Sequence, residues 1–159
     1  KHKAAFKMDR LAAVSEFKLK GKTFICILPS TFMNLSGKAV KYWMEKEKIA
    51  IEHILVVVDE LAIPLSKFRL RPSGSDAGHN GLKSIQELLG TDQYPKLRFG
   101  IGNNYPKGMQ ADFVLSKWLK AEEPVVLLKI EKCLELMESF ITAGIEQTMT
   151  AFNNLSIKL

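Results

Sequence analysis

The feature that most constrains the fold is an uninterrupted apolar run, Ile54-Leu55-Val56-Val57-Val58. A strand with no polar alternation is typically buried on both faces, as a central parallel strand is when helices lie above and below it. Apolar runs in this chain stay far below the ~20 residues that a membrane-spanning helix needs. The run therefore predicts a buried strand of an α/β domain.

Strand and helix patterns alternate around this run. Before it we predict two strands joined by a tight turn at Gly21, then a helix over 36–48. After it come a basic strand over 67–70, a helix over 81–89 ended by Gly90, and a strand over 97–102. We expect a single domain over residues 1–159, an α/β three-layer sandwich with helices on both faces of a mixed, mostly parallel sheet.

The last third of the chain is predicted to be helical from Ala121, with a division at Gly144. Its apolar face is predicted from helical spacing to contain Val126, Ile130, Cys133, Leu134, Met137, Phe140 and Ile141. A domain of this class usually opens with a buried strand and a helix, whereas residues 1–28 supply only a hairpin. We therefore expect the first strand to be missing.

Composition limits the class of partner. The formal net charge is +6, which favours attraction of a phosphate-rich partner without proving one. The start of the sequence has no signal-peptide pattern, and Cys26 and Cys133 lack metal-ligand spacing, so we expect a cytoplasmic protein with reduced core cysteines.

Four polar segments lie where a predicted strand ends or a helix begins: 31–37, 58–61, 78–83 and 97–102. Ligands of open α/β sheets bind outside the carboxyl ends of the strands, so these segments are expected to converge on one cleft.

Each candidate has two interpretations. Asn34 is either a helix N-cap or an amide that holds a water near a carbonyl. Asp59 either accepts a backbone N–H or orients a histidine. His79, with Asn80, either bonds loop backbone or belongs to the site, and Gly78 permits close approach of a substrate or only shapes the turn.

Three basic residues, Lys67, Arg69 and Arg98, lie on predicted strands and are expected to face one direction. They form either a solvated basic face or a set of phosphate contacts. A nucleotide hydrolase is a rival interpretation of the acidic strand end, but it needs the phosphate loop G-x-x-x-x-G-K-[ST], which no stretch fits.

Taken together, five segments resemble the bacterial peptidyl-tRNA hydrolases: Leu28-Pro29-Ser30-Thr31-Phe32-Met33-Asn34-Leu35-Ser36-Gly37, Val58-Asp59-Glu60-Leu61, Lys67-Phe68-Arg69-Leu70, Gly78-His79-Asn80-Gly81-Leu82-Lys83 and Leu97-Arg98-Phe99-Gly100-Ile101-Gly102. They occur in the family's order with near-family spacing, and the resemblance runs from about Lys20 to the C-terminus.

The resemblance implies hydrolysis of the ester between a peptide and the 3′ ribose of tRNA, by a monomer that needs no metal or cofactor. It implies that Asp59 orients a general-base histidine, that Asn34 positions the water or the oxyanion, and that Asn80 holds the peptide or the 3′ end. It further implies that His79 assists beside Asn80. Binding is implied for Met33 and Gly78 in the pocket and for Lys67, Arg69 and Arg98 on tRNA phosphates.

One departure from the family pattern matters. The family's base histidine lies in a motif like G-L-G-N-x-G-x-x-Y-x-x-T-R-H-N, and no stretch of residues 1–159 matches it. A general base contributes ~10²–10⁴-fold, so we expect an N-terminally truncated chain that is impaired or inactive as an enzyme.

Two alternatives without catalysis remain. One is a scaffold similar to the chloroplast intron-splicing factors that resemble this family, and the other is a plain RNA-binding module. Asp59, Asn34 and Asn80 argue against the scaffold, which has no need of a site.

Overall fold

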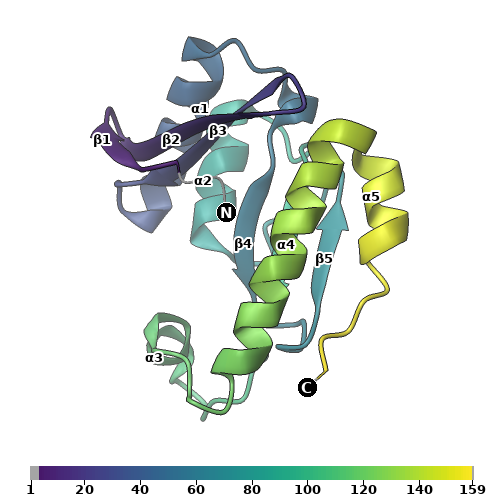
Figure 1. Cartoon of the computed structure of the whole chain (residues 1–159). Helices are drawn as coiled ribbons and strands as arrows, with labels where there is room; N and C mark the ends of the chain where they lie inside the picture. Colours follow the sequence, from purple (N-terminus) through teal and green to yellow (C-terminus); the bar gives the residue numbers. More distant parts are fainter. Residues whose placement is uncertain (1–3, 159) are drawn as a thin grey trace. The chain divides into compact units, whose positions relative to one another are not determined.

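The computed structural model describes residues 4–158, which form two compact units. The first contains residues 4–54 and 73–94, and the second contains residues 55–72 and 95–158. Figure 1 traces the elements of each along the chain.

The first unit opens with an antiparallel sheet of three strands, β1 (Lys7–Asp9), β2 (Ala12–Leu19) and β3 (Lys22–Pro29). Both residues of the β2–β3 turn have positive φ, 50° at Lys20 and 76° at Gly21, as hairpin turns that match strand twist require. Phe17 and Phe24 are register partners, and their rings stack at 4.8 Å. The predicted hairpin is confirmed.

Two helices complete the first unit, α1 (Ser36–Lys46) and α2 (Asn80–Leu89), with short 3-10 turns η1 (Met33–Leu35) and η2 (Ile51–His53). Gly90 ends α2 in the left-handed conformation, with φ of 72°, which glycine adopts without steric cost. The predicted boundaries of α2 are therefore confirmed within one residue.

The second unit contains a mixed sheet, in the order β4 (Val56–Glu60), β6 (Lys96–Gly100) and β5 (Phe68–Arg71). Strands β4 and β6 are parallel, whereas β5 and β6 are antiparallel. The predicted α/β class with a mixed sheet is confirmed. The prediction that the apolar run is buried on both faces is wrong, because Val57 is 47% exposed. Among residues 4–158, β4 pairs along one edge only, so it is not a central strand there.

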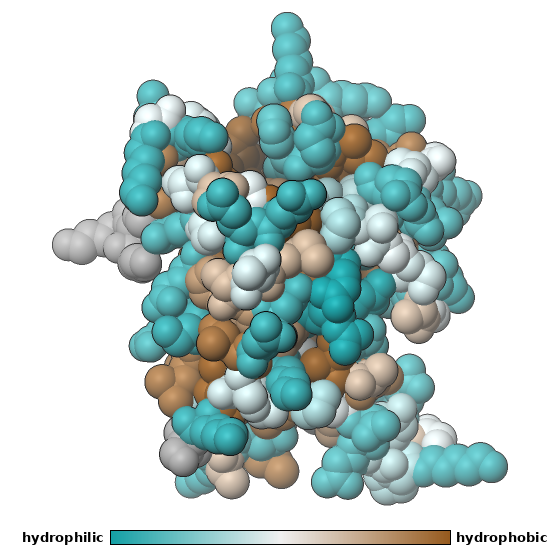
Figure 2. Space-filling model, turned by 90° about the vertical axis from the view of Figure 1, so that its right-hand side faces the viewer, coloured by the Kyte–Doolittle hydropathy of each residue, from teal (hydrophilic) through white to brown (hydrophobic). Residues whose placement is uncertain are grey.

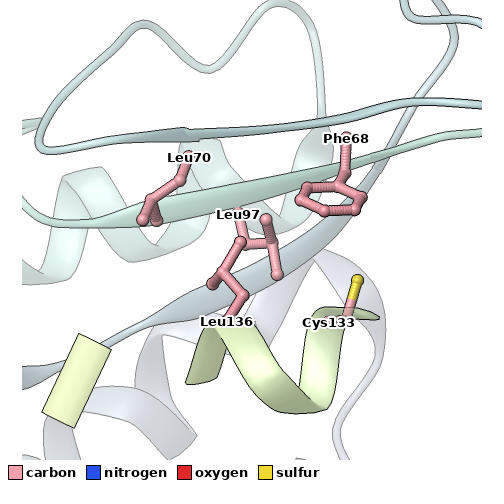
Figure 3. Close-up of a cluster of buried hydrophobic side chains, with 5 residues drawn as sticks. All are labelled: Phe68, Leu70, Leu97, Cys133 and Leu136. Carbon is pink, nitrogen blue, oxygen red and sulfur yellow. The ribbon is translucent and has the colours of Figure 1, made fainter. Parts of the chain in front are cut away.

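Three helices belong to the second unit, α3 (Gln110–Leu115), α4 (Glu123–Ala143) and α5 (Ile145–Phe152). Figure 3 shows Cys133 and Leu136 of α4 pointing at Phe68, Leu70 and Leu97 of the sheet, where they form a buried cluster. Within the part of the chain that the structure describes, no helix has both the length and the apolar composition to cross a membrane.

The buried face of α4 differs from the predicted one. Ile130 and Leu134 are 43% and 37% exposed, whereas Lys129 and Leu136 are completely buried. Apolar side chains at the surface are ordinary, and Figure 2 shows brown residues among teal ones over one face of the molecule. The buried lysine is the unusual observation.

Strand β5 ends the sheet, and one side chain covers part of its outer edge. Asn153, which follows α5, accepts a hydrogen bond from Leu70 N–H at 2.8 Å and donates one to Leu70 C=O at 3.0 Å. One carboxamide thus satisfies both backbone groups of Leu70, as a residue of a neighbouring strand does.

Candidate functional site

In the first unit, the beginning of α1 packs closely against α2. The Gly37 N–H donates to Ser84 Oγ at 2.8 Å. A Cβ at Gly37 would lie 2.3 Å from the Ser84 carbonyl oxygen, closer than any side chain tolerates. Glycine therefore permits the contact that places the segment before α1 beside the first turn of α2.

Met33 and His79 meet over the first turn of α2. A Cβ at Gly81 would lie 2.9 Å both from Met33 Sδ and from His79 Cε1. Met33 is nevertheless 58% exposed. The structure thus brings two of the predicted site residues together, with an apolar thioether at the surface beside the imidazole.

Asn34 does not cap a helix. The N-cap residue of α1 is Leu35, and no side chain accepts a hydrogen bond there. The capping interpretation of Asn34 is therefore wrong. Its side chain is exposed, which leaves the interpretation as a site amide as a prediction.

His79 caps α2. Its Nδ1 accepts hydrogen bonds from the N–H groups of Gly81 at 3.1 Å and Leu82 at 3.3 Å. Because an accepting ring nitrogen carries no proton in neutral imidazole, this geometry places the proton on Nε2. These hydrogen bonds agree with the interpretation of His79 as a residue that bonds backbone at the helix start. With Nδ1 occupied and Nε2 protonated, the ring can donate a hydrogen bond but is poorly placed to act as a base.

The turn before α2 presents Asn80. Asp76 accepts hydrogen bonds from Gly78 N–H through Oδ1 and from His79 N–H through its carbonyl, both at 2.8 Å. Gly78 has φ of 83°, so a glycine is needed there for the turn itself. Asn80 is the first residue of α2 and its side chain is exposed.

Asp59 lies in the second unit. It is the fourth residue of β4 and the register partner of Phe99 in β6. The predicted position of Asp59 at a strand end is confirmed, and β4 continues one residue further, to Glu60. Asp59 is half-buried at the carboxyl end of a parallel strand, which is where ligands of such sheets bind.

The three basic candidates differ in exposure. Lys67 and Arg69 are exposed, whereas Arg98 is only 9% exposed. Arg69 and Arg98 are register partners and so share a face, as predicted. The Arg98 guanidinium donates to Glu60 Oε1 at 3.2 Å. Contact between Arg98 and a phosphate stays a prediction, and it requires the guanidinium to reach beyond this ion pair.

The predicted apolar face of α4 does not include Lys129. Its Nζ donates to the carbonyl oxygens of Leu65 at 2.7 Å and Gly100 at 2.5 Å, and it lies 3.7 Å from the centre of the Phe99 ring. Burial lowers the pKa of Lys129 to about 8. The available signal was the spacing 126, 129, 133, 136, 140, which places Lys129 on the buried stripe.

Cys133 lies one turn after Lys129. Burial raises the pKa of its thiol to about 11, and the nearby Lys129 opposes the shift. Such a thiol is unreactive at neutral pH. Across residues 4–158, no three His, Cys, Asp or Glu side chains are grouped as metal ligands.

Known proteins are similar to this chain in sequence and in fold. A family model described as peptidyl-tRNA hydrolase matches residues 1–159. Peptidyl-tRNA hydrolases of Parabacteroides distasonis and Bacteroides fragilis are each 48% identical over 149 residues, which are 94% of this chain and 80% of each relative. A crystal structure of peptidyl-tRNA hydrolase from Acinetobacter baumannii matches with a TM-score of 0.91 at 27% identity, covering 99% of this chain and 81% of that one. The chain therefore belongs to the peptidyl-tRNA hydrolase family.

Proposed function

We propose that this protein hydrolyses peptidyl-tRNA and so recycles tRNA in translation. Water attacks the ester carbonyl, the bond to the 3′ ribose oxygen breaks, and the products are a peptide carboxylic acid and a free tRNA hydroxyl. The observation that carries the proposal is the meeting of Met33 and His79 at the start of α2, with Asn34 and Asn80 exposed on the same two segments.

The first unit supplies neutral hydrogen-bonding groups in this proposal. The Asn34 amide donates to the oxyanion or holds the attacking water, since an amide both donates and accepts. Asn80 binds the peptide or the 3′ end, and Met33 provides apolar contact to the substrate. His79 donates from Nε2, because its Nδ1 is occupied by backbone N–H groups.

The charged candidates have roles of their own in the proposal. Asp59 orients the general-base histidine and stabilises its protonated form. Lys67 and Arg69 contact tRNA phosphates, joined by Arg98 if it reaches past Glu60. Because His79 is engaged through Nδ1 and no stretch of the printed sequence matches the family's base-histidine motif, we propose that these 159 residues bind peptidyl-tRNA and hydrolyse its ester slowly.

The first experiment compares mass and activity. A purified chain of 17.9 kDa would be incubated with N-acetylated aminoacyl-tRNA, and the released N-acetyl amino acid would be measured. Slow cleavage with tight tRNA binding is expected. Fast cleavage at this mass would contradict the proposed lack of a base and would make His79 the residue to substitute next.

Asn34 offers a sharper test of the site. Asn34→Asp keeps the shape but replaces an amide donor with a carboxylate, so cleavage should fall by about 10²-fold. Unfolding free energy should change by less than about 0.5 kcal/mol, because the side chain is exposed. Asn154→Asp, an Asn-to-Asp change near the C-terminus, is the matched control. Equal activity of Asn34→Asp and the control would remove Asn34 from the site.

Binding to tRNA should depend steeply on salt. Each phosphate contact through Lys67 or Arg69 adds about one unit to the slope of log affinity against log salt concentration. If binding keeps this slope but the ester is not cleaved, even by a longer chain that includes the family's base histidine, the RNA-binding or scaffold alternative is favoured.

We further propose a cytoplasmic monomer. Size-exclusion chromatography with light scattering tests the oligomeric state.

A further inference from the structure

The segment 61–67 connects two candidate site residues of the second unit, Asp59 and Lys67. Backbone hydrogen bonds attach it to the end of β6: Gly100 N–H donates to Lys67 C=O at 3.1 Å and Gly102 N–H donates to Ile63 C=O at 2.9 Å. A Cβ at Gly100 would lie 2.2 Å from the Pro64 carbonyl oxygen. The segment therefore lies directly against the backbone of β6.

A single buried ammonium bridges these two pieces of backbone from α4. Lys129 donates one hydrogen bond to Leu65 C=O in the segment and one to Gly100 C=O at the strand end. Its side chain is 0% exposed. A carbonyl oxygen in an irregular segment has no partner in a β-ladder. Lys129 supplies a hydrogen-bond donor to one carbonyl oxygen in each of these two pieces of backbone.

Filling this core position with a lysine is unfavourable for folding. Burying an ammonium opposes folding, and the hydrogen bonds and the Phe99 ring replace its lost hydration only in part, as its lowered pKa indicates. An apolar residue of the same length would fill the space without this cost. A destabilising charged group between the segment 61–67 and β6 suggests that Lys129 has a role other than stabilising the fold.

We propose that Lys129 is a positioning residue, which fixes the segment 61–67 against β6 and thereby sets the placement of Lys67 relative to Asp59. The consequence for tRNA rests on the proposed function. The consequence for the segment itself does not, so the two are measured separately.

The test compares Lys129→Met, which keeps the length and removes the donors, with Lys129→Gln, which keeps a neutral donor. Lys132→Met is the matched control, because Lys132 is a partly exposed lysine of the same helix that pairs with Glu135. Amide hydrogen exchange at Gly100 and Gly102 reports attachment of the segment. Exchange at Leu70, whose N–H donates a hydrogen bond to Asn153, reports the rest of the second unit.

In Lys129→Met, exchange at Gly100 and Gly102 should accelerate about tenfold relative to Leu70, and affinity for tRNA should fall by a similar factor. Resistance to urea should be unchanged or higher, a combination that a merely structural lysine would not give. Lys129→Gln should restore part of the protection, and Lys132→Met should leave exchange unchanged.

Unchanged exchange at Gly100 and Gly102 in Lys129→Met would overturn the proposal. So would a uniform acceleration that includes Leu70 together with lower resistance to urea, which would make Lys129 a stabilising residue only. If the unsubstituted chain binds no tRNA, the proposed function fails, whereas the exchange result still decides whether Lys129 fixes the segment.

Discussion

Both units contain close contacts that only glycine permits, but their polar side chains differ in exposure. At the start of α1 and α2, glycines let backbone approach side chains closely, and the polar groups of Asn34 and Asn80 stay at the surface. At the end of β6, the charged side chains of Arg98 and Lys129 are themselves buried and hold other groups. In the first unit these candidate side chains therefore remain exposed, whereas in the second unit Arg98 pairs with Glu60 and Lys129 donates to backbone carbonyl groups.

The largest test of this comparison is to add one methyl group in each unit. Gly37→Ala would bring Cβ to 2.3 Å from the Ser84 carbonyl oxygen, and Gly100→Ala would bring it to 2.2 Å from that of Pro64. Neither backbone can move without breaking its element, so each change should destabilise by about 3 kcal/mol. Urea unfolding measures the loss.

Gly90→Ala is the matched control for both substitutions. Its Cβ would meet nothing within 4 Å, and only the positive φ is unfavourable. A loss of about 1 kcal/mol is expected. If Gly37→Ala were as mild as this control, the packing of α1 on α2 would not require a glycine, and the close approach would not explain how Met33 reaches His79.

A smaller effect concerns the cap of α2. His79→Ala removes the acceptor of two backbone N–H groups and should cost about 1 kcal/mol, whereas His79→Asn restores a capping acceptor and should recover most of it. Thermal unfolding measures both. If cleavage of peptidyl-tRNA falls in His79→Asn while stability is kept, the imidazole has a role beyond capping; equal activity would limit His79 to the cap.

The smallest effect is a dependence of stability on pH. The pKa of Lys129 is lowered from 10.5 to about 8 by burial, so between these values the unfolded chain binds more protons than the folded one. Raising the pH through this range therefore favours folding. Urea unfolding of the unsubstituted chain relative to Lys129→Met should show stability increasing from pH 8 upward.

Cys133 acts in the opposite direction, which makes the comparison with a variant necessary. Its pKa is raised from 9.0 to about 11, so the unfolded chain loses this proton first and stability falls as pH rises above 9. The thiol is present in both proteins and largely cancels in the difference. A difference that stays flat between pH 8 and 9 would show that Lys129 is not buried as an ammonium.

Local patterns predicted the elements better than they predicted the environment of charged side chains. The turn at Gly21 and the end of α2 at Gly90 depend on neighbouring residues and were predicted correctly. The predicted apolar face of α4 includes Ile130 and omits Lys129, because only apolar residues at helical spacing were assigned to it. The carbonyl groups that accept from Lys129 lie 64 and 29 residues away, and no local pattern contains them.

The candidate site shows the same limit. Sequence motifs brought together Met33, Asn34, His79 and Asn80, and the structure places Met33 beside His79. The motifs did not reveal that Arg98 is paired with Glu60, because the side-chain directions of both residues depend on strand register. Charge type was therefore predictable, whereas exposure was not.

The contact between Asn153 and Leu70 has a consequence for behaviour in concentrated solution. An outer strand whose N–H and C=O groups are free can recruit a strand from another molecule and begin aggregation. In this protein both groups of Leu70 are already occupied by one carboxamide. The segment after α5 therefore opposes the addition of a strand from another molecule to β5. A chain that ended before Asn153 would leave the backbone groups of Leu70 without this partner, and we expect it to self-associate.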